Sequence, residues 1–95
     1  MKTYSIRASV RVDSRIKDRD TWAVDLIEGS NLSDELKAGW FWATWPDRVE
    51  LVFPVRADER SIEQYAKEVA LVLAGAANVV SNPQLTVEEK SANEA

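Results

Sequence analysis

The sequence contains neither cysteine nor histidine. Without cysteine it can form no disulfide and perform no thiol redox chemistry, which suits a reducing compartment. The usual sites for zinc and other transition metals also lack their sulfur and nitrogen ligands. Carboxylates remain as ligands for magnesium or calcium, but their spacing matches no calcium-binding loop. We therefore expect no metal and no other cofactor.

Catalytic motifs are also missing. Only three glycines occur, and they form neither a phosphate-binding loop nor a nucleophile elbow. The acids between Asp13 and Glu28 are numerous but lie among basic residues. Acid–base catalysis by two carboxylates requires surroundings that separate their pKa values, and nothing in this segment indicates such surroundings. The sequence predicts a protein that is not an enzyme.

Long apolar runs are absent as well. No segment approaches the length of a membrane span, and the first residues lack the apolar stretch of a signal peptide. We expect a soluble cytoplasmic protein. The 95 residues fit one domain, and a hydrophobic share of 45% is typical of a globular chain. We assign residues 1–89 to a single α+β domain and residues 90–95 to a flexible tail.

Two segments alternate between apolar and polar residues, as strands with one buried face do. They cover residues 4–12 and 49–55. Pro54 lies within the second segment and indicates a strand edge, bulge or end, because proline cannot donate a ladder hydrogen bond. Two further strands are expected: the tryptophan-rich segment 40–45, which a short turn joins to 49–55, and the segment 84–88.

The clearest helical pattern covers residues 59–80, where apolar residues recur every three or four positions. Ser61 and Gln64 fit a capping box near its start. In its second half the polar face disappears, which is typical of a helix buried on more than one side. Leu71 and Ala74 lie opposite the core stripe and suggest a surface for a partner. The alternative is that a loop within residues 29–38 covers them.

Residues 14–38 fit two patterns. Within them, residues 21–28 alternate like a strand but also fit a helical stripe that Gly29 could end. A weak internal repeat favours the helix, because residues 10–15 resemble residues 55–60, which lead into the long helix. We therefore favour a ferredoxin-like βαββαβ arrangement, with a sheet of about four strands and the long helix on one face. The alternative is an antiparallel β-meander with a C-terminal helix.

The chain has four tryptophans, three of them within six residues. On a strand, Trp40 and Trp42 share one face and Trp45 lies on the other. Only one of these faces can belong to the core unless something covers the second. Tryptophan is enriched at interface hot spots, because it buries a large rigid surface and keeps a hydrogen-bond donor. The alternative is that both faces pack within the monomer.

Three arginines form a separate candidate site. Arg7 and Arg11 lie on the polar face of the first predicted strand, and Arg56 joins them if that strand adjoins 49–55. Their charges could pair across strands, or they could bind single-stranded nucleic acid. The net charge of −4 argues against a general nucleic-acid-binding protein. The middle strands also lack the outward aromatic residues of an RNA-recognition motif.

These features favour a protein–protein interaction module. We expect a small accessory or inhibitor protein, with a phage or bacterial origin as a hypothesis, that occupies a partner's surface and forms a homodimer. The residues expected to contact the partner or a second copy are Trp40, Trp42, Trp45, Leu71 and Ala74. One alternative is a nucleic-acid-binding domain that uses Arg7, Arg11 and Arg56. Another is a structural subunit of a larger assembly. We expect no membrane partner.

Overall fold

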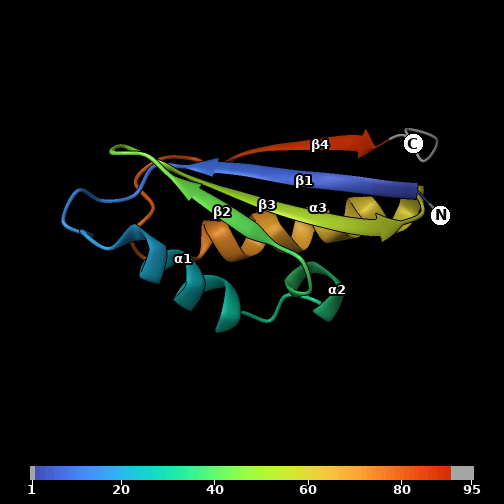
Figure 1. Ribbon diagram of the computed structural model, residues 1–95, viewed down its shortest axis with the longest axis horizontal. Helices are drawn as coiled ribbons and strands as arrows, with labels where there is room; N and C mark the ends of the chain where they lie inside the picture. Colours follow the sequence, from blue (N-terminus) through green and yellow to red (C-terminus); the bar gives the residue numbers. More distant parts are fainter. Residues whose placement is uncertain (1, 91–95) are drawn as a thin grey trace.

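The computed structural model describes residues 2–90 and has an α+β architecture (Figure 1). In chain order its elements are β1 (Lys2–Val10), α1 (Arg19–Glu28), α2 (Asp34–Lys37), β2 (Phe41–Thr44), β3 (Val49–Ala57), α3 (Glu59–Ala74) and β4 (Gln84–Lys90). The predicted α+β class with a four-stranded sheet is confirmed. No helix within residues 2–90 is long and apolar enough to cross a membrane.

The four strands form one antiparallel sheet in the order β2-β3-β1-β4. The central ladder joins β1 to β3, from Lys2 opposite Ala57 to Val10 opposite Val49. α1 and α2 lie between β1 and β2 in the chain, and α3 lies between β3 and β4. Each of these two connections skips one strand of the sheet, as in two interleaved split βαβ units.

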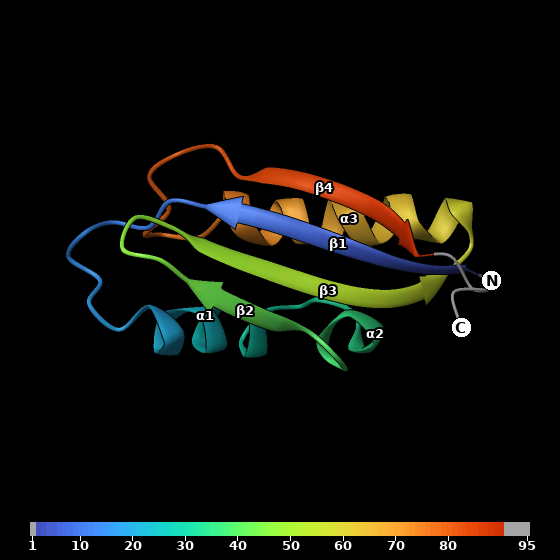
Figure 2. The same ribbon diagram turned by 45° about the horizontal axis from the view of Figure 1, so that its top comes forward.

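The helices all lie on one side of the sheet, so the molecule has two layers (Figure 2). The core lies between these layers. Both central strands direct their alternate apolar residues into it, as the period-two pattern predicts. These buried residues are Tyr4, Ile6, Ala8 and Val10 from β1 and Val49, Leu51, Phe53, Val55 and Ala57 from β3. The opposite side of the sheet, called here the open face, is covered by no helix of the described chain.

Aspartate side chains cap the two longer helices. Asp18 accepts a hydrogen bond from the Thr21 backbone N–H at 3.0 Å, and Asp58 accepts one from the Ser61 N–H at 2.8 Å. Each cap satisfies a backbone donor that has no partner within the first helical turn. The predicted capping box at Ser61 and Gln64 is therefore wrong, because Asp58 is the cap of α3.

α3 is also shorter than the predicted helix 59–80. It ends at Ala74, and the Gly75 N–H closes its last turn on helix carbonyls. The chain then turns, and Val79 pairs with Val12 in an isolated bridge. This contact lies more than sixty residues away in the sequence, so the local apolar pattern could not reveal it.

The remaining boundaries differ in smaller ways. Residues 21–28 are helical in α1, which excludes the β-meander alternative. Pairing between β2 and β3 ends at Val52, two residues before Pro54, which agrees with a proline at a strand edge. Lys90 belongs to β4, although the tail was predicted to begin there. The rest of the predicted tail, 91–95, lies outside the described residues.

Candidate functional site

Trp40 and Trp42 pack between the sheet and α1. Their ring centroids are 5.0 Å apart, and Trp40 stacks on the core residue Phe53 with centroids 6.2 Å apart. Both indoles donate to carboxylates of α1: Trp42 Nε1 to Asp20 at 2.7 Å and Trp40 Nε1 to Glu28 at 3.3 Å. These two predicted partner-binding residues therefore join β2 to α1 within the monomer.

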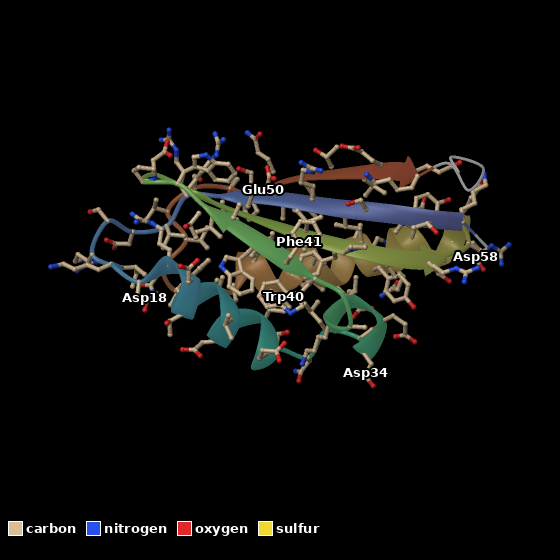
Figure 3. The ribbon with its side chains drawn as sticks, viewed as in Figure 1. Asp18, Asp34, Trp40, Phe41, Glu50 and Asp58 are labelled. Atoms are coloured by element: carbon tan, nitrogen blue, oxygen red, sulfur yellow. The ribbon has the colours of Figure 1, made fainter. Side chains whose placement is uncertain are left out.

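The other aromatic residues of this segment lie on the open face. Phe41, labelled in Figure 3, is opposite Val52 on β3 and is 53% exposed. Trp45 follows β2 and is 38% exposed, with the Arg48 guanidinium 4.6 Å from its ring centroid. This distance permits a cation–π contact. The structure thus separates Trp45 from Trp40 and Trp42, as strand geometry predicts.

The predicted arginine site is partly occupied by carboxylates. Arg7 Nη1 lies 3.3 Å from Glu50 on the neighbouring strand, and Arg11 Nη2 lies 3.9 Å from Asp47. Arg56 is exposed and makes no ion pair with another residue in the range 2–90. Cross-strand charge pairing, the first alternative considered for this face, therefore describes Arg7, whereas Arg11 lies after the end of β1 and its partner Asp47 lies between β2 and β3.

A groove of about 580 Å³ lies between α1 and α3 on the helix side. We call it the interhelical groove. It is lined by Asp25, Leu26, Gly29, Ser30, Asn31, Leu32, Glu68, Leu71, Val72 and Gly75. Leu71 is 74% exposed, the largest exposure among the large apolar side chains of residues 2–90. The segment 29–32 borders the groove and leaves Leu71 uncovered. Ala74, also predicted as a contact residue, is exposed outside the lining.

The helix side that surrounds this groove is acidic. α1, α2 and α3 together contain eight carboxylates and four basic side chains. Among residues 2–90, the one helix carboxylate in an ion pair is Glu59, whose Oε1 lies 3.8 Å from Lys2 Nζ. The sequence arguments did not single out the groove acids Asp25 and Glu68. The acidic excess of the helical segments was the one sequence signal for these groove acids. That excess does not reveal which acids share a surface.

Glu68 has a defined position in the groove wall. Its carboxylate accepts hydrogen bonds from the Ser33 backbone N–H at 2.9 Å and from the Ser33 hydroxyl at 2.8 Å. Both donors are neutral, so they orient the carboxylate without cancelling its charge. The bonds also join α3 to the loop before α2, which keeps the segment that borders the groove in place.

Shifted pKa values elsewhere have local structural causes. A side-chain hydrogen bond from Arg15 is the main reason that the pKa of Asp13 falls to about 2. The pKa values of Asp18 and Asp58 are lowered chiefly by the backbone N–H groups that they cap. Stabilisation of a charged carboxylate by such bonds indicates capping rather than acid–base catalysis. Within residues 2–90, no three potential metal-ligating side chains of Asp or Glu lie together.

Comparison with known proteins gives information about the fold only. No known family model matches the chain, and no curated protein matches it. It resembles the crystal structure of a protein of unknown function from Nitrosomonas europaea, with a TM-score of 0.59 and 17% identity. The resemblance covers 100% of this chain and 95% of that chain. At this identity the similarity shows a shared fold.

Proposed function

We propose that the protein is a non-enzymatic interaction module that binds another protein through the interhelical groove. The exposure of Leu71 beside an apolar-lined hollow is the observation that carries this proposal. Moving one leucine side chain from water to an apolar interface contributes about 1.5–3 kcal/mol. A partner that covers Leu71, Leu26 and Val72 together would gain a compact hot spot of the kind found at interface centres.

This proposal shifts the expected contact from the tryptophans to the interhelical groove. Trp40 and Trp42 already contact α1 and Phe53, so they have less surface to offer a partner. Leu71 remains as the central contact residue, with Ala74 near the groove. An accessory or inhibitor protein that acts by covering a partner's surface fits this arrangement. Homodimer formation and a cytoplasmic location stay predictions.

The nucleic-acid alternative has weaker support. Arg7 and Arg11 already lie beside carboxylates, which would compete with phosphate groups for them. Nucleic-acid affinity depends largely on basic side chains that neutralise phosphates. The exposed aromatic residues Phe41 and Trp45 lie at one edge of the sheet rather than on its two middle strands. We therefore favour a protein partner.

Affinity purification from the cell of origin, followed by calorimetry with the purified partner, tests this function. The chain, its Leu71→Glu variant and the matched control Val80→Glu are used as baits. Val80 is also apolar and 61% exposed, but it does not line the groove. We expect Leu71→Glu to weaken partner binding by about tenfold or more, and Val80→Glu to leave it unchanged. Equal affinity for the native chain and Leu71→Glu would contradict the proposal.

A further inference from the structure

The interhelical groove combines an apolar lining with an acidic surrounding surface, and this combination restricts its occupant. We propose that the groove takes a basic amphipathic helix of the partner protein. This inference rests on the function proposed above and adds the chemistry of the segment that binds. Two independent features support it: the backbone hydrogen bonding of the groove walls and the charge of the helix layer.

The walls favour a helical ligand. α1 and α3 satisfy their backbone hydrogen bonds internally, apart from their ends, and so offer no strand edge to an extended peptide. A peptide that enters an apolar groove must still satisfy its own backbone groups, because unpaired buried N–H and C=O groups are costly. A helix satisfies them within itself. Its apolar stripe can then contact Leu26, Leu71 and Val72 in the helix-in-groove mode.

The charges favour a basic ligand. Asp25 and Glu68 line the groove, and the three helices carry twice as many carboxylates as basic side chains. With one exception, no helix carboxylate within residues 2–90 is in an ion pair. Lysine or arginine on the flanks of a bound helix would supply counter-charges to Asp25 and Glu68. A second copy of this chain would instead place carboxylates opposite carboxylates.

The length of the groove wall sets the scale of the ligand. On the α3 side the groove is lined from Glu68 to Gly75, which corresponds to about two helical turns or about 12 Å. A partner helix would place about two turns against this wall and would present apolar residues at every third or fourth position. The expected motif is therefore a leucine-type stripe with basic residues on both sides.

Fluorescence anisotropy with three labelled synthetic peptides of about 16 residues tests the inference. The first has a leucine stripe with lysine flanks, the second has the same stripe with glutamate flanks, and the third is a scrambled form of the first. We expect the first to bind with a dissociation constant in the micromolar range and the others to bind at least about tenfold more weakly. NMR shift changes should be centred on Leu26, Leu71 and Val72.

Matched variants identify the surface that binds. Leu71→Glu should abolish binding of the lysine-flanked peptide, Asp25→Asn should weaken it a few-fold, and Val80→Glu should leave it unchanged. Raising the salt concentration from about 50 mM to about 500 mM should also weaken it, because exposed charges are screened.

The inference is overturned if the lysine-flanked peptide shows no binding, if the glutamate-flanked peptide binds equally well, or if the NMR changes lie on the open face. In each case the proposed function is tested separately, by comparing how the purified partner binds the native chain and Leu71→Glu. Loss of that partner with Leu71→Glu would leave the function standing, whereas partner binding that is insensitive to Leu71→Glu would remove it whatever the peptides do.

Discussion

Phe41 and Trp42 are neighbours in the chain but have opposite surroundings. The Trp42 side chain lies on the helix side, where its indole N–H donates to Asp20 at 2.7 Å. Phe41 faces the open side of the sheet and is 53% exposed. At the residue scale, the alternation of a single strand thus separates a structural aromatic residue from a surface one.

Substitution at these two positions should have unequal effects on folding. We expect Trp42→Ala to lower the free energy of unfolding by about 3 kcal/mol, because it removes a large packed ring and leaves a gap beside Trp40. Phe41→Ala should change it by about 0.5 kcal/mol, as is usual for exposed sites. Urea denaturation followed by circular dichroism measures both values. Comparable losses would mean that Phe41 also stabilises the monomer.

At the element scale, the two longer helices begin with an aspartate that the fold keeps ionised. Backbone hydrogen bonds from Thr21 and Ser61 are the leading cause of the lowered pKa values of Asp18 and Asp58. A folded-state pKa below the ordinary value of 3.8 means that the native state binds the proton more weakly than the unfolded state does. The resulting stabilisation is complete above that value and is lost as the pH falls through the lower folded-state pKa.

The double variant Asp18→Asn, Asp58→Asn tests this linkage. Asparagine caps helices about as well as aspartate but does not titrate. We expect the melting temperature of the variant to fall less than that of the native chain between about pH 4 and pH 2, with a small difference near pH 7. Asp25→Asn serves as a control that caps no helix. Identical pH profiles for the native chain and the double variant would argue against the capping contribution.

At the scale of the whole molecule, the two layers differ in charge. The helix layer has eight carboxylates and four basic side chains, whereas on the open face Arg7 is paired with Glu50 and Arg56 is exposed. Carboxylate repulsion should oppose the pairing of two helix layers, while the exposed apolar side chain of Leu71 favours it. The balance between these two effects depends on salt.

The salt dependence of dimer formation tests the homodimer prediction. Static light scattering at about 100 µM protein should report a dimer fraction that rises as salt increases from about 50 mM to about 500 mM, because the repulsion is screened. Leu71→Glu should remain monomeric throughout. A monomer at every salt concentration would show that the homodimer prediction is wrong.

Local sequence signals determined much of the architecture. Alternation in residues 4–12 and 49–55 revealed the two central strands and the faces they bury, because side chains on a strand point to opposite sides in turn. The apolar spacing of α3 revealed its long helix and the unusual exposure expected at Leu71 and Ala74. These features depend on residues close together in the chain. They could therefore be predicted without knowing which other elements each strand or helix packs against.

The tertiary structure decided which surfaces are covered. The sequence showed that Trp40 and Trp42 share a face, but only the position of α1 turns that face into a packed layer. The Val12–Val79 bridge accompanies the early end of α3, and the bond from Ser33 to Glu68 positions a groove wall across 35 residues. Such contacts depend on how distant segments meet in space, and periodicity within one segment contains no information about them.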